Sequence, residues 1–286
     1  MKNIVGIRQS TAPLCAAVLA AAVVIAAGGR AQAQQGMGGM SAEPVSAREA
    51  AEQHFDLTGY WVPIITEDWL SRMVTPPIGH IPSGEFSQFL RLTDAAVEEA
   101  MNWAPEADAA AGMECKSFGA GHIMRMPTRL HITWEDDDTL RIDTDYGEQT
   151  RLLRFSPTEA DAARDQGTWQ GHSVASWEAQ GHRRGFVPEP PSRPGVLRVE
   201  TEGMRAGYIS RNGIPYSERA TMREFFVRHD DFGDEWFTVT AILEDPENLA
   251  QPHITATHFR READDERWNS RPCEIVPPFS TSSNGE

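Results

Sequence analysis

The 286-residue sequence carries 42 acidic and 26 basic side chains, a formal net charge of −16 and 40% hydrophobic residues. This composition supports a genuine hydrophobic core in one or two domains and excludes a disordered polymer. The acidic excess argues against nucleic acid and against an anionic membrane surface as partners, because both require clustered cationic side chains.

The first 33 residues have the pattern of a secretory signal peptide. Lys2 and Arg8 precede an apolar stretch at 13–29, and the small residues Ala31 and Ala33, on either side of Gln32, provide a cleavage site. We therefore expect a periplasmic or secreted protein that has no stable membrane insertion after cleavage. Removal of the signal makes the exported chain still more acidic, because the signal contains basic residues and no acidic ones.

The rest of the chain is predicted to form one domain, with an irregular segment at each end. Residues 34–46, rich in Gly, Met and Ser, are expected to form a flexible tether, and residues 277–286 a disordered tail. The sequence predicts a single β-barrel domain over residues 47–276. An insertion at about 71–124 lies within it, and the sequence leaves open whether this insertion forms a lid or a plug.

Apolar and polar residues alternate over nine short stretches with turn residues between them, which is typical of an antiparallel sandwich or barrel. Such tight spacing predicts neighbouring strands and no domain boundary. A helix is expected over 95–103, where Thr93 or Asp94 can cap it and Pro105 ends it. The predicted strands cover residues 57–65, 128–135, 140–145, 149–155, 168–177, 195–201, 220–229, 236–243 and 254–260.

Cys115 and Cys273 are the cysteines that remain after signal cleavage. Two cysteines in an oxidising compartment favour a disulfide, and the alternative is a pair of buried thiols. Neither cysteine stands in a Cys-x-x-Cys or a recognisable nucleophile context, so a catalytic cysteine is not expected.

Several motifs along the chain occur together. They are 56–61, Cys115, 127–155, the strand with Trp169, Gly171, Ser173 and Trp177, and the residues Gly213, Pro215, Ser217, Glu224 and Phe226. In these motifs the chain resembles a large, mostly uncharacterised family of exported bacterial proteins. The resemblance covers residues 56–273 and implies a lipocalin-like (calycin-type) barrel of about eight to nine antiparallel strands with a short helical insertion. Tyr216 departs from the pattern, because many relatives have His there, so the resemblance gives no support for an acid or base at that position.

Glu224 is the candidate general acid or base. It alternates with Met222 and Phe226 on one face of its strand, and an apolar surrounding raises the pKa of a carboxyl group if that face points inward. His258 and His172 are candidates to assist, and we expect His258 to reach the Glu224 face. The alternative is a buried structural Glu that is paired with an Arg.

Aromatic side chains are the candidate walls of a ligand site inside the barrel, which in small barrels holds one small molecule. The spacing of histidines and acids matches no metal motif, and no nucleotide, dinucleotide or haem motif is present, so we expect neither metal nor cofactor. The predicted ligand-binding residues are Trp61, Trp169, Ser173, Trp177, Met222 and Phe226.

The sequence therefore favours an exported barrel that binds a small apolar or aromatic molecule. A cofactor-free acid/base enzyme of the isomerase, cyclase or hydratase type is the first alternative, and a structural envelope-associated protein is the second. The sequence leaves the ligand and the oligomeric state open.

Overall fold

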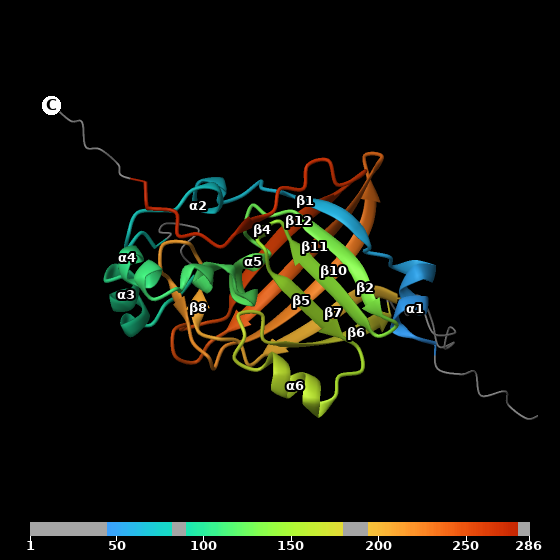
Figure 1. The fold of residues 1–286 in the computed structure, drawn as a ribbon, viewed down its shortest axis with the longest axis horizontal. Coiled ribbons are helices and arrows are strands. Elements are labelled where there is room, and N and C mark those ends of the chain that lie inside the picture. Colours follow the sequence, from blue (N-terminus) through green and yellow to red (C-terminus); the bar gives the residue numbers. More distant parts are fainter. Residues whose placement is uncertain (1–44, 82–89, 180–193, 280–286) are drawn as a thin grey trace, which may run out of the picture. The chain divides into compact units, whose positions relative to one another are not determined.

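The computed structural model describes residues 45–81, 90–179 and 194–279 (Figure 1). The predicted signal peptide at 1–33, residues 34–44 of the predicted tether and residues 280–286 of the predicted tail lie outside the described residues.

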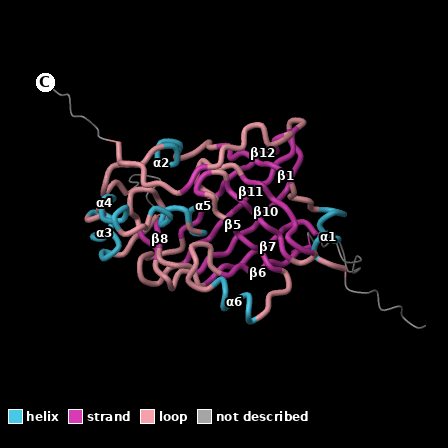
Figure 2. The backbone as a smooth tube through the Cα atoms, viewed as in Figure 1, coloured by secondary structure: helices cyan, strands magenta, loops and turns pink. Residues whose placement is uncertain are grey.

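Nine strands form a closed barrel in the described part of the chain (Figure 2). The prediction of a mainly β barrel is confirmed, and each predicted stretch overlaps one of these strands. Their bounds are β1 (Gly59–Ile64), β2 (Leu130–Asp136), β3 (Thr139–Thr144), β5 (Thr150–Arg154), β6 (His172–Ala179), β7 (Pro194–Glu202), β10 (Thr221–Asp231), β11 (Asp234–Glu244) and β12 (His253–Glu262). Around the barrel the strands follow the order β1-β12-β11-β10-β7-β6-β5-β3-β2.

The expectation of a purely antiparallel barrel is wrong for one pair, because β5 and β6 run parallel. Strand directions cannot alternate all the way around a closed ring with an odd number of strands, so at least one pair must be parallel. Parallel neighbours need a long crossover, commonly helical. Here α6 (Glu159–Asp165) lies in that crossover, with a capping box between Thr158 and Asp161.

Helices and short strand pairs occupy the connections. The predicted helix at 95–103 is confirmed as α3 (Asp94–Met101), whose first turn is capped by the Thr93 side chain. The sequence pattern did not predict the helix α6 or the helix at Ala47–His54, which precedes β1. The other elements are α1 (Ala47–His54), α2 (Trp69–Met73), α4 (Pro105–Ala110), the 3-10 helix η2 (Glu114–Phe118), α5 (Ala120–Ile123), β4 (Tyr146–Gly147) paired with β13 (Arg271–Pro272), and β8 (Gly207–Tyr208) paired with β9 (Pro215–Tyr216).

Apolar side chains fill the interior of the barrel. Trp61 meets Phe237 edge-on with ring centroids 4.7 Å apart, and Phe237 stacks on Phe259 at 4.8 Å. These rings and Phe226 are all fully buried in one hydrophobic cluster that contains residues of every barrel strand. The interior is therefore a packed core.

The two ends of the barrel are covered by different parts of the chain (Figure 1). Phe118, Ile123 and Met126 of the insertion and the turn after it belong to the same buried cluster as the barrel interior, so this part of the insertion is a plug. At the opposite end Ala47 of α1 accepts a hydrogen bond from the Trp177 indole at 3.1 Å, and Phe55 packs edge-on against that ring.

Cys115 of η2 and Cys273 form a disulfide, as predicted. The bond joins the plug to the segment that follows β13, 158 residues later in the chain. No helix in the described ranges has the length and apolar composition that a membrane-spanning helix requires.

Candidate functional site

The predicted acid/base residue, Glu224, faces the barrel interior together with Met222 and Phe226, and all three are buried. Arg151 of β5 donates to both of its carboxylate oxygens, Nη1 to Oε1 at 3.1 Å and Nη2 to Oε2 at 2.6 Å. The two side chains are 0% and 1% exposed. A substrate outside the barrel therefore has no access to Glu224.

Ser173, also a predicted site residue, lies in the same buried polar network. Its hydroxyl is 2.8 Å from the Thr201 hydroxyl, and Thr201 accepts a long hydrogen bond of 3.5 Å from Arg151. This network satisfies polar groups that would otherwise be unpaired in an apolar core. Its geometry indicates a structural link between β5, β6 and β7.

The structure does not bring the two candidate histidines to Glu224. Thr257 and Phe259 of β12 are buried in the interior, so His258 between them points outward, where its Nδ1 lies 2.9 Å from the Thr238 hydroxyl. His172 at the start of β6 contacts Asp165 of α6, with Nδ1 3.0 Å from Oδ2. The three residues do not form an acid/base group.

The predicted aromatic walls pack against the protein itself. Trp61 and Phe226 belong to the barrel core, and Trp177 packs between Phe55 and Phe155 near α1. Trp169 precedes β6 and lies under the guanidinium of Arg205, 4.5 Å from its ring centroid. Met222 belongs to a second buried cluster. None of these residues lines the pocket described next.

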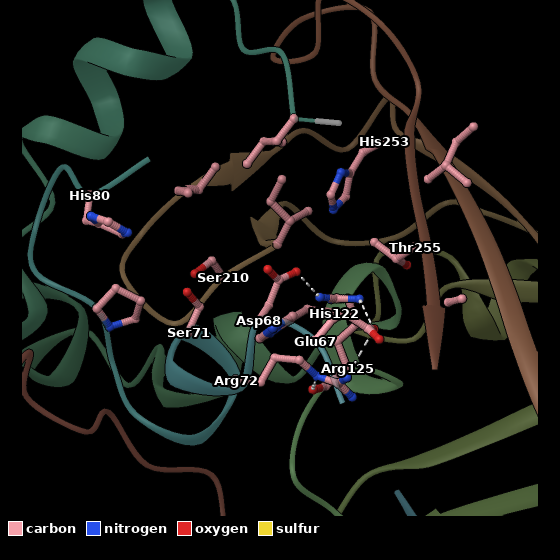
Figure 3. A pocket seen from close by; sticks show the side chains of 16 residues that line it. Glu67, Asp68, Ser71, Arg72, His80, His122, Arg125, Ser210, His253 and Thr255 are labelled. Carbon is pink, nitrogen blue, oxygen red and sulfur yellow. Dashed lines mark hydrogen bonds and ion pairs between the residues drawn. The ribbon is translucent and has the colours of Figure 1, made fainter. Parts of the chain in front are cut away.

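A pocket of about 300 Å³ lies at the end of the barrel where β12 begins (Figure 3). The segment around α2, the helix α5, the loop at 209–214 and the first residues of β12 form its walls. Three of its apolar residues also belong to the second buried cluster, so packing fixes this side of the pocket. The apolar walls are Pro76, Leu90, Ile209, Ile214, Ile254 and Ala256.

Four charged side chains of alternating sign form another wall, and Figure 3 shows the interactions that join them. Arg125 Nη2 is 3.0 Å from Asp68, Arg125 Nη1 is 3.8 Å from Glu67, and Arg72 Nη1 is 3.5 Å from the same Glu67 oxygen. Burial lowers the pKa of Arg72 to about 10 and also lowers that of Arg125. Both arginines stay charged at neutral pH, so this wall carries no formal net charge.

His122 of α5 lines the pocket beside these charges. Burial, aided by the nearby charges of Arg125, Arg211 and Arg72, lowers its pKa to about 3, so its ring is neutral at physiological pH. Nδ1 is 2.9 Å from the Ser117 carbonyl oxygen, which can only accept a hydrogen bond. The proton therefore lies on Nδ1, and Nε2 is a hydrogen-bond acceptor.

Close packing of Tyr216 against glycines holds α5 in place. A Cβ atom at Gly119 would lie 2.2 Å from the Tyr216 hydroxyl oxygen, and one at Gly121 would lie 2.9 Å from its ring. The glycines thus allow the ring to approach the backbone of α5 next to His122. In the sequence, the Gly-rich stretch that precedes β2 indicates such close packing. The sequence does not show which other segments this stretch contacts.

The described residues contain no cluster of three or more His, Cys, Asp or Glu side chains that could hold a metal ion. Comparison with known proteins gives no function either: no family model matches the chain, and no curated protein or solved structure shows significant similarity to it.

Proposed function

We propose that this protein is an exported, lipocalin-like barrel that binds a small, largely apolar molecule in the pocket at the start of β12. The proposal differs from an ordinary lipocalin arrangement, in which the ligand occupies the barrel interior. In this chain aromatic and aliphatic side chains fill that interior, and space for a ligand lies beside the plug.

The observation that carries the proposal is the pocket itself, which is lined by six apolar residues and by a charge-balanced polar wall. An engineered apolar cavity of about 150 Å³ is large enough to bind benzene. A pocket of about 300 Å³ therefore has room for an aromatic molecule with a short side chain. Pre-formed apolar walls with few polar groups are the usual features of a small-molecule site.

We prefer binding over acid/base catalysis because the candidate groups lack the properties that catalysis needs. Glu224 is fully buried in its ion pair with Arg151. His122 has a pKa of about 3, far below neutral pH, and a general base is most effective when its pKa is near the working pH. No observation favours the structural envelope role over binding.

The test is titration of the exported chain, without its signal peptide, with 4-propyltoluene and with 4-propylphenol, followed by calorimetry and by ligand-detected NMR. Thr255→Phe should abolish binding of both compounds, because Thr255 lines the pocket from the same face of β12 as the inward-facing Thr257, and the larger ring fills part of that space. Ser176→Phe is the control on the outer face of β6, away from this pocket, and should bind as the wild type does. Failure of both compounds to bind the wild-type chain would overturn the proposal, as would unchanged binding by Thr255→Phe.

A further inference from the structure

The polar groups of the pocket are not equally available to a ligand. Arg125 is paired with Asp68 and Glu67, and Arg72 binds Glu67 through Nη1 and donates from Nε to the Arg125 carbonyl at 3.0 Å. The remaining nitrogen of Arg72, Nη2, has no hydrogen-bond partner among the described residues, but it is fully buried. Ser210 donates its hydroxyl hydrogen to Asn212 at 2.6 Å. The Nε2 atom of His122 differs from these groups, because the neutral ring offers a lone pair there.

The Ser117 carbonyl fixes which edge of the His122 ring can meet a ligand. Since Nδ1 points at that carbonyl, Nε2 lies on the other side of the ring, and His122 is a lining residue of the pocket. The side chain is buried at 5% exposure, so water solvates it poorly. A ligand that fills the pocket displaces water from Nε2, and a ligand that supplies a donor avoids leaving this acceptor unpaired.

We infer that the ligand of this pocket carries a neutral hydroxyl group, as in a phenol or an alcohol, and donates its hydrogen to Nε2 of His122. This inference rests on the proposed function, since it names the chemical class that the same pocket would take.

The charges near His122 disfavour an ammonium group as the donor to Nε2. The guanidinium groups of Arg72, Arg125 and Arg211 are close enough to oppose protonation of the ring. The same positive field opposes an ammonium group placed at Nε2, whereas a hydroxyl group brings no charge. A carboxylate cannot donate to Nε2.

The experiment compares three ligands of similar size in the wild-type chain at pH 7. These are 4-propylphenol, 4-propyltoluene, in which a methyl group replaces the hydroxyl, and protonated 4-propylbenzylamine. We expect the phenol to bind at least about fivefold more tightly than 4-propyltoluene, and the amine to bind more weakly than either. If 4-propyltoluene binds as tightly as the phenol, the inference fails while the proposed function stands. If none of the three binds, both fail.

His122→Asn tests the residue itself. The Asn amide can still donate to the Ser117 carbonyl in place of Nδ1, but it has no counterpart of Nε2. The affinity ratio of phenol to 4-propyltoluene should fall to about one. His229→Asn is the control, because His229 lies away from the pocket with its ring against Asp231 and Thr238, and it should keep the wild-type ratio.

A second readout does not depend on whether His122→Asn folds. In the ¹⁵N NMR spectrum of the wild-type chain, the unprotonated Nε2 of His122 should shift when 4-propylphenol is added and accept a hydrogen bond. Addition of 4-propyltoluene should leave that shift nearly unchanged. The same shift with both compounds, or no shift with the phenol, would overturn the inference.

Discussion

Arg151 and Glu224 lie on β5 and β10, strands that are not neighbours in the barrel, and their side chains meet across its interior. The ion pair therefore ties together two sides of the sheet that share no backbone hydrogen bonds. Two further strands, β6 and β7, separate them on the shorter path around the barrel.

Removal of one partner of this pair should be strongly destabilising. Glu224→Gln leaves a buried guanidinium without its counter-charge and should lower the free energy of unfolding by about 3 to 5 kcal/mol. Replacement of both residues by Met should cost much less than the sum of the two single changes, because no unpaired charge remains. Urea unfolding of the single and double variants measures this coupling, and additive losses would contradict it.

The disulfide should stabilise the fold. Loss of a cross-link between residues 158 positions apart is expected to cost about 2 to 5 kcal/mol, mainly because the unfolded chain gains freedom. Cys115→Ser combined with Cys273→Ser should lower the midpoint of thermal unfolding, as should reduction of the wild-type chain. The double variant should no longer respond to reductant, and an unchanged midpoint in that variant would refute the stabilising role.

His122 should make the stability depend on pH. The pKa of its ring is 6.5 in an unfolded chain and about 3 in the folded state, so between these values the unfolded state binds more protons. The free energy of unfolding should therefore rise with pH over this range, with a contribution of up to about 1.4 kcal/mol per pH unit, and this stability is lost as the pH falls below 6.5.

Urea unfolding between pH 3 and pH 7 checks the slope. His122→Asn should remove this contribution and flatten the profile, whereas the control His229→Asn should keep it. The carboxyl groups also titrate in this range, so the informative quantity is the difference between the wild-type and His122→Asn profiles. Parallel profiles would show that His122 does not resist protonation in the folded state.

Tyr216 offers a test of the packing that holds α5. Its ring is buried, and its hydroxyl has no hydrogen-bond partner among the described residues. Tyr216→Phe should therefore stabilise the chain or leave it unchanged, because it removes an unsatisfied polar atom. Gly119→Ala should destabilise it by about 1 to 3 kcal/mol, because the new methyl group meets that hydroxyl.

The Gly119→Ala and Tyr216→Phe changes should be coupled. The double variant should recover part of the loss caused by Gly119→Ala, since the nearest atom to the new methyl group is then absent. Thermal unfolding of the four chains gives the coupling energy. Zero coupling would mean that the hydroxyl group does not limit the approach of α5.

The alternation of apolar and polar residues within each segment predicts where the barrel strands lie. Alternation along the chain identifies all nine barrel strands, and it correctly groups Glu224 with Met222 and Phe226 on one face. The disulfide follows from the number of cysteines and the expected compartment. Each of these inferences depends on spacing within one segment or on composition.

The candidate site depends on contacts between segments, which alternation does not encode. Glu67, His122, Ile209 and Ala256 are far apart in the sequence and meet at one end of the barrel. The outward direction of His258 depends on which face of β12 packs inside, so the sequence pattern alone does not determine whether it meets Glu224. Arg151, the actual partner of Glu224, lies on a strand that the pattern does not connect to it.

The position of the disulfide gives the barrel an uneven mechanical resistance. Eight of the nine barrel strands, from β2 to β12, lie between Cys115 and Cys273, and β1 lies outside this covalent loop. When the chain is stretched from residues 45 and 279, tension passes from Cys115 to Cys273 through the sulfur atoms. Stretching can peel β1 from its neighbours β12 and β2, while the other eight strands lie within the covalent loop and cannot be extended until the disulfide breaks.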